Sequence, residues 1–311
     1  TSTSAGITLN DSTGDATVIF AADNSVDITC TINGASSGEG TIQVTGSTKT
    51  FKNTIGNSQP IAQLTIGGTT VFEAAVQTVA LTTTAAISNS TTLSVSGVTN
   101  LGANITSSGT QTYTGAVTLS ANVTLTSSGD VITFSNTVNS ADSTNRDLTV
   151  TTGGDTVHIN FDGIVGQSKG LGAIALTGVL DLNAAIVDAN SLTVSGVSLL
   201  DADVTTSGTQ TYSGAITLGT AARTLEGSII QTVAVDGAQN LTITGNLDLN
   251  GAITQVAVFA VSGTTDLGAN VTTSGTQTYS SAVTLSTDVT LTSSDDNFTF
   301  SSTVDSADST A

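Results

Sequence analysis

The 311-residue chain carries 24 acidic and 5 basic residues, a formal net charge of −19, although only 9% of its residues are charged. Nucleic-acid binding needs clustered cations that displace phosphate counterions, so this balance excludes a nucleic-acid partner and disfavours anionic membrane surfaces. Val, Ile, Leu, Ala, Thr and Ser dominate the composition, which predicts short strands and no long helices.

The N-terminal part, residues 1–45, is the least repetitive. The runs GITLN, ATVIFAA, VDITCTI and TIQVTG predict short strands separated by Asp, Asn, Ser and Gly. Terminal units of repeat stacks differ from inner units, so we interpret 1–45 as an atypical β segment, either a cap or a set of assembly strands. Thr1 opens no signal peptide and is expected to be a mature terminus or a cut from a longer chain.

The single cysteine, Cys30, excludes an intramolecular disulfide. Its place in the alternating run DITCTIN predicts a buried apolar side chain, because a free cysteine packs like a small hydrophobic residue. An intermolecular link through this thiol is the alternative. Elsewhere, no apolar run approaches the ~20 residues that a membrane-spanning helix requires, so no membrane span is expected.

Residues 46–311 repeat themselves. The run 51–76 aligns without gaps with 161–186, and a longer phrase recurs at 93–144, 192–218 and 259–310. Its most constant part, GTQTY, contains all three tyrosines of the chain, Tyr113, Tyr212 and Tyr279. Close internal repetition predicts stacked copies of one structural unit.

The spacing between copies predicts the size of that unit. Two offsets, 161 − 51 = 110 and 192 − 93 = 99, are multiples of 11, and 279 − 113 = 166 and 279 − 212 = 67 each lie one residue from such a multiple. A block of about 11 residues is the size of one strand plus one turn. We therefore predict an all-β fold, a β-solenoid (β-helix) of stacked strand-turn repeats with coils of about 22–33 residues. An array of β-sandwich domains is the alternative.

Alternating residues within the repeats predict which side chains face the core. Residues 116–119 (AVTL), 132–134 (ITF) and 298–300 (FTF) place apolar side chains on one face and Thr on the other. Val117 is therefore expected inside the stack and Thr118 outside. The tyrosines are expected near one side of the stack, either packed inside or forming an outer stripe.

Residues that could carry chemistry are few, and we expect no enzymatic activity. His158 is the only histidine, which excludes a histidine metal cluster or a His-dependent catalytic triad within one chain. Carboxylates at turns could hold structural Ca²⁺, the one candidate cofactor, with plain solvated aspartates as the alternative. The calcium candidates are Asp142, Asp147, Asp295 and Asp296, and Asp201 and Asp203 form a further carboxylate pair.

Glycans or other cell-surface matrix are candidate partners. As a candidate modification of the chain itself, several asparagines fit the N-glycosylation pattern Asn-X-Thr. Such matches also arise by chance in a chain rich in Asn and Thr. The matching residues are Asn104, Asn122, Asn240, Asn270 and Asn297.

Phrases such as TSGTQTYSGAITL, ANVTLTSSGDVITFSNTV and LGAIALTGVLDLNAAI resemble the modules of bacterial β-strand-repeat surface proteins, loosely grouped with filamentous-haemagglutinin-like giant adhesins. The resemblance covers roughly residues 46–311. It implies a right-handed parallel β-solenoid, secretion and a location on the outside of a bacterial cell, and it brings no catalytic residues.

The leading functional hypothesis is a secreted structural protein that assembles end to end into an extracellular filament or a surface layer. Its physical basis is that an open solenoid ends in unpaired strands, which are a template for another chain. The alternatives are a stalk segment of a giant adhesin and a calcium-dependent, polysaccharide-active β-helix enzyme.

Overall fold

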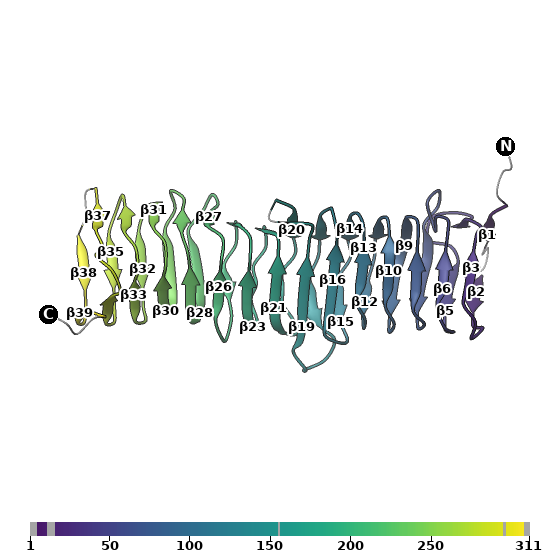
Figure 1. Cartoon of the computed structure of the whole chain (residues 1–311), viewed down its shortest axis with the longest axis horizontal. Helices are drawn as coiled ribbons and strands as arrows, with labels where there is room; N and C mark the ends of the chain where they lie inside the picture. Colours follow the sequence, from purple (N-terminus) through teal and green to yellow (C-terminus); the bar gives the residue numbers. More distant parts are fainter. Residues whose placement is uncertain (1–4, 11–15, 155, 295–296, 308–311) are drawn as a thin grey trace. The chain divides into compact units, whose positions relative to one another are not determined.

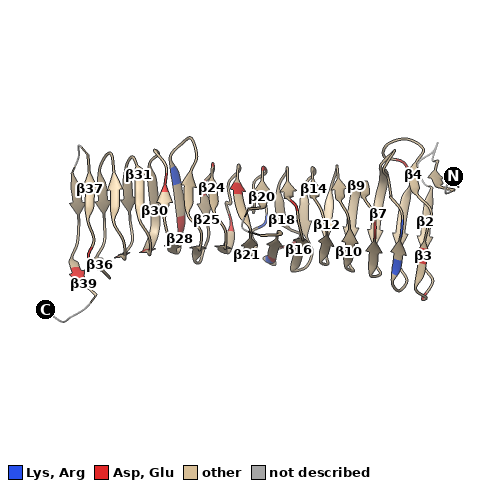
Figure 2. Ribbon diagram, turned by 45° about the horizontal axis from the view of Figure 1, so that its top comes forward, with Lys and Arg blue, Asp and Glu red and all other residues tan. Residues whose placement is uncertain are grey.

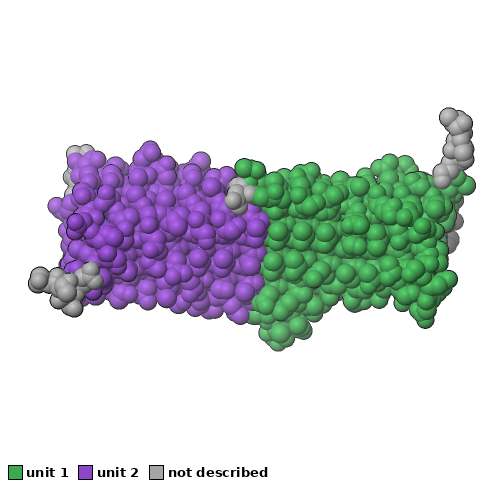
Figure 3. Space-filling view, in the orientation of Figure 1, with its two compact units in different colours: residues 1–163 green, residues 164–311 purple. Residues whose placement is uncertain are grey.

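The computed structural model describes residues 5–10, 16–154, 156–294 and 297–307. Every regular element in these ranges is a β-strand, and the strands stack in parallel in about 15 coils that form a β-solenoid (Figure 1). This confirms the predicted fold class. The β-sandwich alternative is wrong, because its sheets would be antiparallel. Two compact units divide the chain, residues 1–163 and 164–311 (Figure 3).

In the first unit, three parallel ladders form the three faces of each coil. Residue pairing defines them, with β9 contributing to two ladders. The first ladder holds β1 (Ile7–Leu9), β4 (Ile32–Gly34), β9 (Val76–Thr83), β11 (Leu93–Val95), β14 (Gln111–Tyr113), β17 (Ile132–Phe134) and β20 (His158–Phe161). The second holds β2 (Thr17–Phe20), β5 (Thr41–Val44), β7 (Ile61–Ile66), β9, β12 (Thr99–Leu101), β15 (Val117–Leu119) and β18 (Val138–Ser140). The third holds β3 (Val26–Ile28), β6 (Lys49–Phe51), β8 (Thr70–Phe72), β10 (Ile87–Ser90), β13 (Ile105–Ser107), β16 (Val123–Ser127) and β19 (Arg146–Thr151).

The second unit has the same organisation, with β28 and β30 each contributing to two ladders. Its first ladder holds β21 (Leu171–Thr177), β23 (Ala189–Val194), β26 (Gln210–Tyr212), β28 (Arg223–Thr232), β30 (Leu241–Leu249), β33 (Thr265–Leu267), β36 (Val283–Leu285) and β39 (Val304–Ser306). The second holds β22 (Val179–Leu182), β24 (Ser198–Leu200), β27 (Ile216–Leu218), β29 (Val235–Asp236), β31 (Ile253–Val256), β34 (Val271–Thr273) and β37 (Leu291–Ser293). The third holds β25 (Val204–Thr205), β28, β30, β32 (Phe259–Val261), β35 (Gln277–Tyr279) and β38 (Phe298–Phe300).

The predicted 11-residue block and the 22–33-residue coil are wrong for most of the chain. From Leu93 to Val123 a new strand begins every six residues, and three strands complete a coil of 111 − 93 = 18 residues. Paired residues in consecutive coils lie between 17 and 27 positions apart. The copies differ in length by 11 residues, which corresponds to two of these short strand-turn units. Over the 11 residues from Val76 to Ile87, two successive strand segments begin.

Each short strand places its first and third side chains inside and its second outside. Val117 and Leu119 are buried, whereas Thr118 between them is half-buried on the outer face. This confirms the predicted alternation. Three-residue strands are long enough to build the core, because each of the three faces contributes two inward side chains and together these fill the interior. The coil is therefore smaller than the about 22–33 residues that the offsets between the copies predict.

The tyrosines pack inside, which confirms one of the two predicted placements, but they do not keep to one side. In the second unit Tyr212 pairs with Val194 and Thr232 in the first ladder. Tyr279 pairs with Val261 and Phe300 in the third. The 67-residue offset is not a whole number of coils, so the repeated phrase moves from one face of the solenoid to another.

Candidate functional site

The calcium candidates that the structure describes are bonded to different neighbours. Asp142 Oδ1 accepts a hydrogen bond from the Thr144 amide at 2.8 Å, and Asp142 Oδ2 lies 3.3 Å from Arg146 Nη2. The Thr144 hydrogen bonds, with a smaller contribution from Arg146, hold the pKa of the Asp142 carboxyl below its usual value. Asp147 instead exchanges two hydrogen bonds with Asn122, at 2.9 and 3.0 Å.

Asp295 and Asp296, the other two calcium candidates, lie outside the described residues. Within the described ranges, no three His, Cys, Asp or Glu side chains gather closely enough to hold a metal ion. Asp201 and Asp203 are likewise bonded to different groups. Asp201 Oδ1 lies 3.6 Å from Arg223 Nη2, and Asp203 Oδ1 accepts a hydrogen bond from the Thr224 amide at 2.8 Å. Calcium binding therefore stays a prediction without a site assembled in the described part of the chain.

His158 and Cys30, the single histidine and the single cysteine of the chain, are both half-buried. His158 begins β20 and is half-buried. Cys30 lies between β3 and β4 and is also half-buried, so the prediction of a buried strand residue is wrong. The alternation in DITCTIN breaks at this cysteine because the chain turns a corner there.

Asparagines at the corners connect consecutive coils, which sequence reasoning missed. The Asn104 carboxamide accepts from the Thr124 amide at 2.8 Å, and Asn270 accepts from the Thr290 amide at 2.7 Å. Asn240 makes the same bond to the Val258 amide at 3.2 Å. These three asparagines matched the glycosylation pattern, and their side chains satisfy backbone donors of the following coil.

Lys49 is buried inside the first unit with its charge satisfied by backbone oxygens. It is 2% exposed, and its Nζ donates to the carbonyls of Ala22, Asn24 and Ser47 at 2.6, 2.8 and 2.7 Å. Sequence reasoning counted it only as one of five cations. Its position two residues before Phe51 in a three-residue strand was the signal that it points inward.

We expect Lys49→Met to lower stability, because the three hydrogen bonds of its ammonium group to backbone carbonyls are lost, and a hydrogen bond to a charged group contributes about 1.5–3 kcal/mol. Lys52→Met is the control: Lys52 makes a partly exposed ion pair with Glu73 at 2.6 Å, and such pairs contribute about 0–1 kcal/mol. Thermal unfolding followed by circular dichroism checks both variants. Equal melting temperatures for the two would contradict the role assigned to Lys49.

The repeated Gln-Thr-Tyr places a polar pair inside the core. Gln111 Nε2 donates to the Thr126 carbonyl of the next coil at 2.8 Å and to Ser107 Oγ at 3.0 Å. Tyr113 Oη donates to Gln111 Oε1 at 2.8 Å. The corresponding tyrosine–glutamine bonds are Tyr212 to Gln210 at 2.9 Å and Tyr279 to Gln277 at 3.0 Å. The phrase is therefore a structural device that satisfies its own polar atoms.

Burial raises the pKa of Tyr113, Tyr212 and Tyr279 above the usual tyrosine range. A raised folded-state pKa contributes stability that is complete below the unfolded pKa of about 10 and is lost as pH rises above it. We expect tyrosinate absorbance in an alkaline titration to appear only together with the loss of the strand signal in circular dichroism. Ionised tyrosines in a fully folded protein would contradict this.

The last described coil, formed by β37, β38 and β39, exposes the residues that other coils bury. Phe300 is 38% and Val304 44% exposed. Their counterparts in the first copy of the phrase, 166 positions earlier, are Phe134 and Val138, and both are 0% exposed. The same sequence is thus covered at one place in the chain and open at another.

Aromatic stacking shows what covers the phrase in its first copy. The Phe134 ring lies between the rings of Tyr113 and Phe161, at centroid distances of 5.4 and 4.9 Å and nearly parallel to both. In the last coil, Phe300 stacks on Tyr279 at 5.1 Å. The position that Phe161 fills in the first stack has no described occupant over Phe300.

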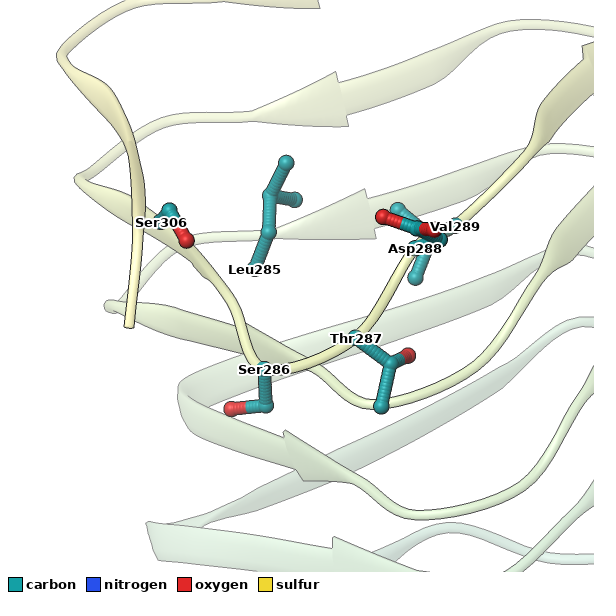
Figure 4. A pocket seen from close by; sticks show the side chains of 6 residues that line it. All are labelled: Leu285, Ser286, Thr287, Asp288, Val289 and Ser306. Atoms are coloured by element: carbon teal, nitrogen blue, oxygen red, sulfur yellow. The ribbon is translucent and has the colours of Figure 1, made fainter. Parts of the chain in front are cut away.

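A hollow of about 530 Å³ adjoins this coil. Figure 4 shows Leu285 projecting between the chain that carries Ser306 and the turn that carries Asp288 and Val289. Ser286 and Thr287 complete the lining. The hollow contains one carboxylate, that of Asp288, so its lining does not supply the carboxylate pair that most glycosidases use.

The first coil also exposes apolar residues. Ile19 of β2 is 56% exposed, and Val26 of β3 is 40% exposed. Phe20 is half-buried and packs edge-on against Phe51 at 5.2 Å. Each unit therefore has a terminal coil with incompletely covered apolar side chains.

Comparisons with protein-family models, with curated proteins and with solved structures found no match. The described residues contain no helix of the length and apolar character that a membrane crossing requires.

Proposed function

We propose that this protein is a secreted structural protein of the bacterial cell surface that assembles end to end through its terminal coils. The observation that carries the proposal is the exposed coil at Phe298, Phe300 and Val304. The counterparts Ile132, Phe134 and Val138 are all 0% exposed, and strand β20 covers the first two. An uncovered parallel strand offers unpaired backbone groups to another strand. Contact between two different ends of identical chains propagates into a filament.

The net charge of −19 opposes this association, because like-charged copies repel one another. Salt screens charges over a Debye length of about 8 Å at physiological ionic strength. Assembly is therefore expected to increase with both protein concentration and ionic strength.

Sedimentation velocity over a range of concentration and salt tests the proposal. Phe300→Asp should remain monomeric, because it places a charge on the apolar end coil. Thr278→Asp is the matched control, since it adds the same charge to the outer face of the covered strand β35. A wild-type protein that is monomeric throughout, or a Phe300→Asp variant that assembles like Thr278→Asp, would refute end-to-end assembly.

A stalk segment of a giant adhesin is the second candidate. It is supported by the repetition itself, because residues 132–140 and 298–306 occupy equivalent coils and the former are covered by their own chain. In a stalk, further residues of the same polypeptide would cover Phe298–Phe300. Sequencing the native reading frame past Ala311 discriminates the two, since a stalk requires a continuation with strands that resemble His158–Phe161.

A further inference from the structure

We propose that the occupant of the open coil is the first coil of a second copy, with β1, β2 and β3 of that copy pairing in parallel with β37, β38 and β39. This inference rests on the proposed end-to-end function and assigns its register. In the chain itself, β20 covers β17 in parallel, with Ile159 over Ile132 and Phe161 over Phe134. The pattern that covers this phrase is therefore an aliphatic residue, an outward residue and a phenylalanine.

Among the strands of the first coil, only β2 repeats that pattern. Val18 and Phe20 of β2 are half-buried, inward-facing residues, and Ile19 between them is exposed. In the β2–β38 register, Val18 lies over Phe298 and Phe20 over Phe300. Phe20 then takes the stacking position that Phe161 takes over Phe134.

When β2 of the second copy pairs with β38, its neighbours β1 and β3 come to lie over β37 and β39. Along the chain, β37, β38 and β39 follow one another as β1, β2 and β3 do. With β2 on β38, the apolar strand β1 (Ile7–Leu9) meets Leu291 of β37. The strand β3 (Val26–Ile28) meets Val304 of β39. Aliphatic residues thus lie on aliphatic residues, and the aromatic residue lies on an aromatic residue, in one arrangement.

The same register opposes two carboxylates on the outer face. Asp27 of β3 and Asp305 of β39 are both exposed central residues of their strands, and Figure 2 shows an acidic segment at β39. Adjacent parallel strands lie ~4.8 Å apart, so these like charges repel. The fold tolerates such a pair elsewhere, because Asp248 and Asp266 are paired in adjacent coils.

We expect Asp305→Asn to assemble at lower salt than the wild type, because one of the opposed charges is removed. Asp236→Asn is the matched control, since it removes the same charge from an exposed residue of β29, away from the end coil. Equal salt requirements for the two variants would contradict the opposed pair.

Site-specific disulfides test the register directly. In a Cys30→Ser background, one chain carries Thr299→Cys and a second carries Ile19→Cys, so that oxidation of the mixture can give only dimers. Cα atoms ~4.8 Å apart across paired strands lie within the range that a disulfide spans. Two further mixtures replace Ile19→Cys by Thr8→Cys or by Asp27→Cys, which test β1 or β3 on β38.

The mixtures are oxidised under conditions where the wild type assembles. We expect the Ile19→Cys mixture to yield at least tenfold more disulfide-linked heterodimer than either of the other two mixtures. Assembly with cross-linking through Thr8→Cys or Asp27→Cys, or through none of the three, would overturn the register and leave end-to-end assembly standing. Absence of assembly by sedimentation would overturn both.

Discussion

Val117→Asp is expected to destabilise the solenoid by several kcal/mol. Val117 is 1% exposed and is paired with Thr99 in the preceding coil and Val138 in the following coil. A carboxylate at this position would be buried between Thr99 and Val138, neither of which carries a charge, and burying an unpaired charge is among the most costly substitutions that a core can receive.

Thr118→Asp is the matched control, one residue along the same strand. Thr118 lies on the outer face between Asn100 and Asn139, where water reaches the side chain. Surface changes of this kind usually shift stability within about 0.5 kcal/mol. Chemical denaturation followed by circular dichroism measures both variants, and similar midpoints would refute the inward–outward alternation.

Phe134→Ala is expected to cost about 3–5 kcal/mol, the usual range for removing a buried phenylalanine. Its ring is enclosed between Tyr113 and Phe161, and the loss leaves a cavity in the aromatic stack. Thermal and chemical unfolding of the variant at low protein concentration, where assembly does not contribute, measure this cost.

Phe300→Ala provides the comparison, because Phe300 occupies the equivalent place in the last coil. With one ring face already exposed, its removal is expected to cost the single chain about 1–2 kcal/mol, in proportion to the smaller buried area. In the proposed assembly it should nevertheless be the more damaging of the two substitutions for association. Equal destabilisation of the single chain by both variants would contradict the difference in coverage between the two coils.

The sequence predicted the parallel β-solenoid and the direction of many side chains. Runs such as Val117-Thr-Leu119 and Ile132-Thr-Phe134 alternate apolar residues with threonine, and this period of two is a direct signal of a strand with one buried face. The stacking of repeats followed from the internal copies, since each copy can bury its apolar face only against its neighbours.

The size of the coil could not be predicted because polar residues occupy many inward positions. Thr99, Ser107 and Gln111 all point inside. Because these inward residues are polar, the alternation of apolar and polar residues that marks a strand is interrupted, and the six-residue unit cannot be recognised in the sequence. The hydrogen bonds of Ser107 and Gln111 become visible only in three dimensions, as where Gln111 reaches the Thr126 carbonyl of the next coil.

The exposed coil of β37, β38 and β39, the proposed surface for assembly, was only partly predictable from the sequence. Unpaired terminal strands follow from any open solenoid, but the exposure of Phe298 and Phe300 became evident only when their covered counterparts were compared. The Q-x-Y spacing could have revealed the buried pair from sequence, because residues two apart share one face of a strand. No sequence pattern could show that Asp142 and Asp147 are bonded to separate neighbours.

The most direct test of end-to-end assembly is electron cryomicroscopy of the native protein at high concentration and salt. We predict filaments in which the coils of successive chains continue through each junction at the same ~4.8 Å strand spacing as within a chain, with Phe20 over Phe300. Single chains under all conditions, or filaments joined through the sides of the coils, would contradict assembly through the terminal coils.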